Sequence, residues 1–450
     1  MFEEMDLNGN AGMLKLPGYS NFLINGTFRC CISKLTSICL VLLFSLFIYG
    51  VKFSFFPLDL YRCLYIVFIV LFFFRVVRFR VARVWFYLIF LSLFVLAYSL
   101  FISFYNRSFE LTFSRMVLDY FLTFLIFVPV FYKIVEYLKL DILKLIIYVA
   151  AMQAIVMFLM LAIPSFQKLV LSIIDTNGIE RSEGAFRFRG VGFTGLATYS
   201  MAVTQSFALY LFHIYWSKRL SVFELLYSIF LFILIFFSAL LSARTSLIFL
   251  LSLLFSYLII YFFTKNENLI KAIKFMFVLL FVTFFSVISI LATINSPEIV
   301  KLLEWGGEVI FSFLNNGSAS TASTDAMKSL FFIPEDYTIL FGDGHYLSES
   351  GEYYMFTDIG YLRVLLYGGI LGSSLFYSIF IYLSFLLLKS VKSNWGALYS
   401  VPLFIYSALL FVVNIKGSIF FDGFIAIKLM TIFAFYLLQK NSEIKYPSDR

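Results

Sequence analysis

The chain has 450 residues, of which 62% are hydrophobic, 21% are aromatic and 13% are charged. Soluble domains are about half apolar and about a quarter charged, so this composition excludes a soluble globular protein and indicates an integral membrane protein. The formal net charge of +8 does not indicate nucleic-acid binding, because the basic residues of membrane proteins collect in cytoplasmic loops. All four cysteines lie in or near the first two apolar segments, so no disulfide framework is predicted.

Membrane-spanning helices need about 20 mainly apolar residues each. Twelve segments are predicted on this basis: 33–51, 57–74, 84–104, 116–132, 142–163, 196–216, 222–241, 245–263, 272–294, 359–388, 397–413 and 420–438. The seventh and eighth are separated by a tight hairpin at Ser242, Ala243 and Arg244, or this point is a kink in one longer helix. Residues 359–388 are long for one span and are expected to tilt or project. Because a bilayer offers no hydrogen-bond partners, the predicted fold is an all-α helical bundle.

Lysine and arginine residues predict the orientation. With the N-terminus in the cytoplasm, the inner loops carry a clear basic excess: Arg75, Arg78, Arg80, Arg83, Lys133, Lys139, Lys144, Lys218, Arg219, Lys265, Lys271, Lys274, Lys389 and Lys392. The N-terminus and C-terminus are then both cytoplasmic, and two large loops are external. The predicted organisation is a cytoplasmic segment 1–32, five spans in 33–163, an external loop 164–195, four spans in 196–294, an external loop 295–357, three spans in 358–438 and a cytoplasmic tail 439–450.

The second external loop, residues 295–357, is the one long polar interval of the sequence. It contains nine Asp or Glu residues and two Lys residues, together with Pro297, Pro334 and several glycines. A membrane protein with one sizeable folded loop is expected to do its specific work in that loop or next to it.

Arginines near the predicted outer surface are the candidate ligands for an anion. The first external loop ends with Arg181, Arg187 and Arg189, followed by Gly190, Gly192 and Gly195. Arginine presents a planar fork of donors that suits phosphate oxygens, and glycine allows sharp turns and close approach. An interfacial arginine bound to lipid headgroups is the simpler alternative.

Arg244 is a further candidate, because it has almost no loop around it. A charge at such a place is costly unless it faces a partner or a wet cavity. The alternative is that its side chain reaches out to the headgroups.

His345 is the one histidine predicted to be external, in the stretch LFGDGHYLSESG. Histidine can take up a proton near neutral pH, so His345 is a candidate general base. Asp343 is expected either to orient it or to solvate the turn, and a purely structural hydrogen bond of His345 is the alternative. The other histidine, His213, is expected to be an ordinary interfacial helix residue.

Arg363 lies one turn inside the tenth apolar segment, five residues after Asp358. Thr357 or Asp358 is expected to cap this helix. Arg363 either pairs with a nearby acid inside the membrane or faces the same cavity as the Arg189 region. Three glycines of this segment permit close helix packing: Gly368, Gly369 and Gly372.

Together with the predicted topology, three local motifs make the chain resemble the Wzy-type O-antigen polymerases, within the larger group of polymerases and O-antigen ligases. The motifs are an Arg-Gly pair before a span at Arg189 and Gly190, a hairpin of the S-x-R-T kind from Ser242 to Thr245, and a glycine- and histidine-containing turn that leads into D-x-G-Y-x-R and a GGxxG run. The resemblance covers roughly residues 180–375. Here Ala243 is inserted into the commoner S-R-T sequence.

This resemblance implies a metal-independent glycosyltransferase of the helical GT-C-like class, without a cofactor, in a bacterial inner membrane. The implied reaction, in lipopolysaccharide biosynthesis, moves a growing glycan from undecaprenyl diphosphate to the next lipid-linked repeat unit on the periplasmic face. Cations near the outer leaflet would stabilise the leaving diphosphate: Arg187, Arg189, Arg244 and Arg363. His345 would be the general base, with Asp343 or Asp358 in reserve. Membrane lipids, a chain-length regulator and a flippase are candidate partners.

Three alternatives stay open. An O-antigen ligase would use the same donor but transfer to lipid A core. A flippase or another transporter can have about twelve spans, but it would carry charges along a central cavity. A structural membrane protein without activity is the third reading. The sequence contains no P-loop, no GxSxG, no dinucleotide fingerprint and no cysteine–histidine metal spacing.

Overall fold

The computed structural model describes residues 26–55, 60–73, 81–174, 192–194, 199–293, 312, 322–421 and 424–445. The chain divides into two compact units, Met1–Leu40 and Val41–Arg450. The described part of the first unit is the beginning of helix α1. Within the described ranges the second unit is helical and contains no β-strand, only two isolated β-bridges, Phe53 with Ile174 and Leu347 with Tyr353.

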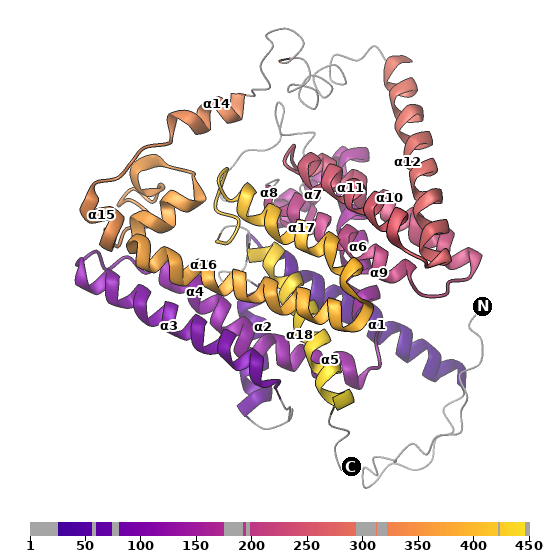
Figure 1. Ribbon diagram of the computed structural model, residues 1–450, viewed down its shortest axis with the longest axis horizontal. Helices are drawn as coiled ribbons and strands as arrows, with labels where there is room; N and C mark the ends of the chain where they lie inside the picture. The colour runs from indigo at the N-terminus through magenta and orange to yellow at the C-terminus, as the bar shows by residue number, and fades with distance from the viewer. Residues whose placement is uncertain are drawn as a thin grey trace. The chain divides into compact units, whose positions relative to one another are not determined.

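The helices follow one another along the whole chain (Figure 1). Their bounds are α1 Gly26–Tyr49, α2 Leu60–Phe73, α3 Arg83–Tyr105, α4 Thr112–Leu122, the π-helix η1 Thr123–Phe127, α5 Val128–Tyr137, α6 Ile142–Ala162, α7 Pro164–Ile173, the 3₁₀-helix η3 Gly192–Thr194, α8 Tyr199–Tyr210, α9 Phe212–Trp216, α10 Val222–Ser242, α11 Ser246–Phe263, α12 Glu267–Thr293, α14 Ala322–Ser329, α15 Asp336–Phe341, the 3₁₀-helix η4 Tyr354–Phe356, α16 Gly360–Trp395, α17 Ala397–Val413 and α18 Phe424–Lys445.

Seven helical stretches in the described chain are long and apolar enough to cross a membrane. They are Arg83–Tyr105, Thr112–Tyr137, Ile142–Ala162, Val222–Ser242, Ser246–Phe263, Glu267–Phe285 and Gly360–Trp395. The protein is therefore an all-helical, multi-pass membrane protein. Each of the twelve intervals predicted from the sequence contains a helix. The seventh and eighth intervals form two separate helices, since Ala243 between them has an extended backbone with φ −163° and ψ 149°.

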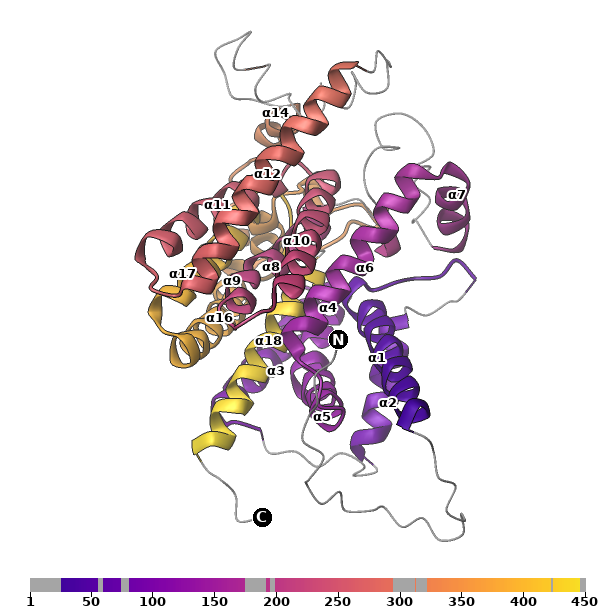
Figure 2. The same ribbon diagram turned by 90° about the vertical axis from the view of Figure 1, so that its right-hand side faces the viewer.

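Helix α8 lies in the core of the second unit. Every side chain from Ser200 to Tyr210 is buried, because the helix packs against α10, α11, α17 and α18 (Figure 2). A helix that is enclosed on all sides needs no polar face. Its polar residues bond within the protein instead, as Tyr210 does by donating to the Phe249 carbonyl at 2.9 Å.

Helix α16 is the element on which the candidate site is built. It packs against α3, α17 and α18, and it is interrupted at Gly369, whose φ of 64° and ψ of −168° are not helical. The break divides the helix into residues 360–368 and 370–395, which fold back on each other. This break accommodates a segment that is too long for one straight span.

Candidate functional site

A folded cap, defined here as residues 336–358, covers the beginning of α16. Its backbone enters the break in the helix. The Asp343 N–H donates to the Leu366 carbonyl at 2.7 Å, and the Gly344 N–H donates to the Tyr367 carbonyl at 3.0 Å. The last carbonyls of a helix segment lack partners within the helix. The cap supplies those partners, so α16 and the cap form one structural unit.

Two glycines make this close contact possible. A Cβ atom on Gly342 would lie 2.4 Å from the Tyr367 carbonyl oxygen, and one on Gly369 would lie 2.3 Å from the Leu340 carbonyl oxygen. Both residues have positive φ, 76° and 64°, a conformation that glycine adopts without a steric penalty. The prediction of close packing at Gly369 is confirmed, although the partner is the cap backbone.

Asp343 is a hydrogen-bond acceptor inside the cap. Thr338 Oγ1 donates to Asp343 Oδ1 at 2.7 Å, and Tyr354 Oη donates to Asp343 Oδ2 at 3.3 Å. Burial raises the pKa of the Tyr354 phenol, and the charge of Asp343 and this hydrogen bond raise the pKa further. Tyr354 is therefore a neutral donor near pH 7, and Asp343 holds the two ends of the cap together.

His345 is partly buried and lies against the same tyrosine. The ring centroids of His345 and Tyr354 are 5.2 Å apart, with 25° between the ring planes. Within the described chain no hydrogen bond joins His345 to Asp343. Asp343 and His345 thus share Tyr354 as a neighbour, the one through a hydrogen bond and the other through a ring contact.

Arg363 is buried at the base of the cap, with 3% of its surface exposed. Its guanidinium carbon lies 4.1 Å from the ring centroid of Tyr346 and 3.6 Å from that of Tyr353. Arginine stacks well on aromatic faces, and a desolvated cation–π contact of this kind is stabilising. The cap therefore encloses a fixed positive charge between two tyrosine rings.

Glu110, which the sequence analysis did not select, connects the cap to the loop before α4. Its Oε2 accepts from the Tyr346 N–H at 2.9 Å, and its Oε1 accepts from the Thr112 N–H at 2.7 Å. Ser108 Oγ also donates to the Gly344 carbonyl at 2.7 Å. In the sequence, Glu110 resembles any acid before a helix, so only the long-range contact reveals its role.

The remaining predicted residues are not brought together with His345 by any described contact. Asp358 is exposed, and Arg244 is partly buried in the hairpin between α10 and α11. The capping prediction for α16 is wrong: the N-cap position is Ile359 and no side chain caps it, while Thr357 Oγ1 accepts from the Ile359 N–H at 3.3 Å. Arg187 and Arg189 lie outside the described residues, as do Arg181, Gly190 and Gly195.

Gly192, just after that arginine cluster, is described, and its backbone comes close to another part of the protein. Its φ is +54°, and a Cβ atom there would lie 2.0 Å from Gln153 Nε2. Gln153 is fully buried on α6, and its Oε1 accepts from the Phe193 N–H at 3.1 Å. Residues 192–194 are thus attached to α6.

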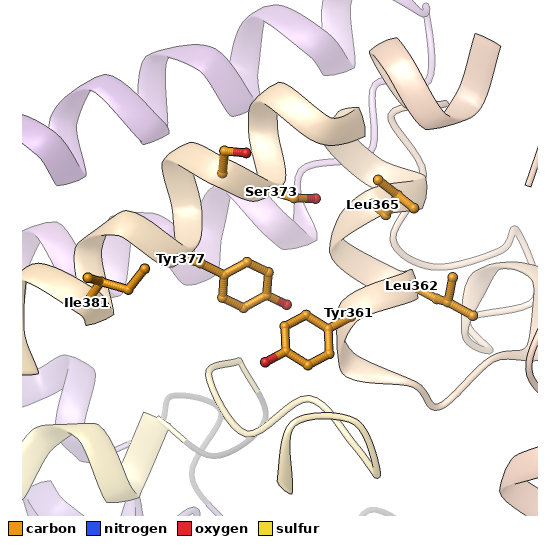
Figure 3. A pocket seen from close by; sticks show the side chains of 7 residues that line it. Tyr361, Leu362, Leu365, Ser373, Tyr377 and Ile381 are labelled. Atoms are coloured by element: carbon orange, nitrogen blue, oxygen red, sulfur yellow. The ribbon is translucent and has the colours of Figure 1, made fainter. Parts of the chain in front are cut away.

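A largely apolar pocket of about 470 Å³ lies in the angle between the two parts of α16 (Figure 3). Tyr361, Leu362, Leu365, Ser373, Ser374, Tyr377 and Ile381 line it. The rings of Tyr361 and Tyr377 meet here, with centroids 5.1 Å apart. The described residues contain no group of three or more His, Cys, Asp or Glu side chains that could hold a metal ion.

No family model, curated protein or solved structure matches this chain. The fold and the site define a helical membrane protein with a cap that encloses an arginine and presents a histidine.

Proposed function

We propose that the chain crosses the membrane twelve times, with both termini in the cytoplasm and the cap on the periplasmic side of a bacterial inner membrane. Two observations support this topology. Helices occupy all twelve predicted intervals, and lysine and arginine alternate between rich and poor loops along the sequence, as the positive-inside rule requires. The loops 164–195 and 295–357 are then external.

We further propose that the protein is a membrane glycosyltransferase that polymerises undecaprenyl-diphosphate-linked oligosaccharide repeat units. The observation that carries this proposal is that a buried cation lies directly beneath the part of the cap that contains the histidine: Arg363 of α16 stacks on Tyr346, the residue that follows His345 in the chain. A lipid diphosphate leaving group needs a fixed positive charge, and a sugar acceptor needs a base.

In the proposed reaction, an acceptor hydroxyl oxygen attacks C1 of the donor sugar and the bond from C1 to the diphosphate oxygen breaks. The diphosphate leaves with the electron pair, and Arg363 stabilises its charge. His345 takes the proton of the acceptor hydroxyl. Asp343 positions Tyr354 against His345. Asp358 is the alternative candidate for the general base. Arg187, Arg189 and Arg244 are proposed to contact the diphosphate as well.

The test is complementation of a deletion strain, with lipopolysaccharide resolved on gels. The variants are wild type, His345→Ala, Arg363→Ala and Arg363→Lys, each checked for normal expression in the membrane. Core with a single repeat unit in the deletion strain supports a polymerase. His345→Ala and Arg363→Ala should reproduce the pattern of the deletion strain. Arg363→Lys should restore only little of the wild-type banding, because lysine lacks the planar fork.

Two other patterns would overturn the proposal. Bare core with long chains accumulating on the lipid carrier would identify an O-antigen ligase. Bare core without external lipid-linked units would identify a flippase, and the catalytic assignments would then fail.

A further inference from the structure

Arg363 is inaccessible in this structure. Only 3% of its surface is exposed, and its guanidinium lies between the rings of Tyr346 and Tyr353. An anion as large as a diphosphate reaches this group only if one of the two rings moves.

Tyr346 is held in place from several sides. It is 1% exposed, its N–H donates to Glu110 Oε2 at 2.9 Å, and its hydroxyl donates to Ser418 Oγ at 3.4 Å. Its ring also contacts Phe113 and Phe421, at centroid distances of 5.9 Å and 5.3 Å. Movement of Tyr346 would break contacts to three separate parts of the chain, so this ring is the fixed wall.

Tyr353 belongs to a short exposed hairpin, residues 347–353. It is 38% exposed and forms an isolated bridge with Leu347. The hairpin is closed locally, since the Ser348 N–H donates to the Glu352 carbonyl at 2.8 Å. A Cβ atom on Gly351 would have no neighbour within 4 Å, so the tip of the hairpin has open space around it.

The residues that flank the hairpin on both sides are held in place. Tyr346 is bonded to Glu110, and Tyr354 donates to Asp343. Lifting the hairpin breaks the hydrogen bond of 2.9 Å from the Phe356 N–H to the Tyr353 carbonyl, but it leaves the bonds of Tyr346 and Tyr354 in place. Glu349 and Glu352 on it are exposed, and their charges would repel an arriving diphosphate from the closed hairpin.

We infer that Tyr353 is a movable cover over an anion-binding site formed by Arg363 on the fixed ring of Tyr346. The ligand class is a diphosphate, an identity that rests on the proposed function. Tyr346 is a positioning residue, because stacking holds the guanidinium plane so that its edge can meet the diphosphate oxygens. A bound diphosphate favours the open hairpin through its affinity for the uncovered arginine.

The test is chemical labelling of the full-length protein in detergent micelles with phenylglyoxal, which modifies accessible arginines. The labelling rate of Arg363 is measured by mass spectrometry, with the exposed Arg107 and Arg115 as internal references. Arg363 should react at least about tenfold more slowly than the references in wild type. Tyr353→Ala should remove most of this difference, whereas Tyr337→Ala, which alters a 52% exposed tyrosine of α15, should not.

Inorganic pyrophosphate tests the ligand class. It should slow the labelling of Arg363 in Tyr353→Ala at lower concentrations than phosphate or sulfate does. Equal protection by sulfate would overturn the diphosphate assignment. Fast labelling of Arg363 in wild type, or no response to Tyr353→Ala, would overturn the cover.

These outcomes separate the inference from the proposed function, since labelling needs no turnover. If Tyr353→Ala exposes Arg363 as expected but Arg363→Ala leaves polymerisation intact, the site exists and the catalytic role of Arg363 fails. If Arg107 and Arg115 also react faster in Tyr353→Ala, the variant has loosened the neighbouring loop and α4 as well, and a movable cover limited to the hairpin is refuted.

Discussion

Tyr377 donates a hydrogen bond of 3.2 Å to the carbonyl of Gly360, 17 positions earlier in the same helix. An unbroken helix would separate two such residues by about 25 Å. The contact exists because α16 breaks at Gly369 and folds back. Asn414 secures the fold-back from α17, since its carbonyl accepts from the Gly360 N–H at 3.1 Å and its Nδ2 donates to Tyr377 Oη at 3.0 Å.

Gly369→Ala is expected to destabilise the protein and detach the cap. The positive φ and the clash with the Leu340 carbonyl should together cost about 1–3 kcal/mol or more. The adjacent Gly368→Ala is the matched control, because its Cβ atom would meet only Tyr98 Cε1 at 3.5 Å, and its effect should stay below about 1 kcal/mol. Thermal unfolding in detergent micelles measures both. Equal midpoints for the two variants would contradict the role of the break.

The ionisation of Tyr354 is expected to report on Asp343. The pKa of Tyr354 is raised by burial, by the charge of Asp343 and by the hydrogen bond to it. Its contribution to stability is therefore fully present below pH 10 and is lost as pH rises through the higher pKa of the folded state. Asp343→Asn should lower this pKa towards its ordinary value but leave the effect of burial.

The measurement for Tyr354 is the tyrosinate absorbance as a function of pH, taken as the difference between each protein and its Tyr354→Phe counterpart. An unchanged titration in Asp343→Asn would show that the carboxylate does not act on the phenol. Thr338→Val serves as a control, since it removes the other hydroxyl on Asp343 and retains the negative charge.

Lys428 is expected to be a structural residue of the membrane core. It is 2% exposed, its Nζ donates to the Phe47 carbonyl at 2.8 Å, and it lies 4.5 Å from the centre of the Phe47 ring. That carbonyl belongs to the last turn of α1, where helical partners are lacking. Lys428→Met should lower the free energy of unfolding by about 1–3 kcal/mol.

The control for Lys428 is Lys392→Met, at an exposed position near the end of α16, which should change stability by less than about 0.5 kcal/mol. Thermal midpoints in the same detergent provide the comparison. A stable Lys428→Met protein would show that the hydrogen bond to α1 is dispensable.

The two histidines are expected to behave in opposite ways. His213 is fully buried, with Nδ1 2.7 Å from the Tyr210 carbonyl and Nε2 2.8 Å from the Tyr399 carbonyl. His213→Phe should lower stability by about 1 kcal/mol through the loss of a hydrogen bond between helices, yet keep polymerisation. His345→Gln should keep stability and lose the banding of lipopolysaccharide. The reverse pattern would exclude His345 as the base.

The sequence by itself determined the class of the protein and the intervals that contain its long apolar helices, but not the shorter helices α7, α14 and α15 in the predicted loops. In a long apolar run, the backbone finds hydrogen-bond partners only within a helix. Composition and segment length were therefore sufficient to predict a helical membrane protein. The interruption at Ala243 could also be predicted, although the sequence left open whether it is a hairpin or a kink. His345 and Arg363 were marked by their chemistry, since one is an imidazole in a polar loop and the other is a charge inside an apolar segment.

The tertiary structure alone decided how those residues are arranged. The Gly368–Gly369 pair permits a break in the helix but does not show that one occurs, because the Leu340 carbonyl that occupies the space beside Gly369 comes from a different helix, α15. Glu110 bonds to the cap across 236 positions. The sequence left two roles open for Asp343, orienting His345 or solvating the turn, and only the structure shows its contacts with Thr338 and Tyr354. Hydrogen bonds and ring contacts between segments far apart depend on packing, and packing leaves no periodic pattern in a sequence that is apolar almost throughout.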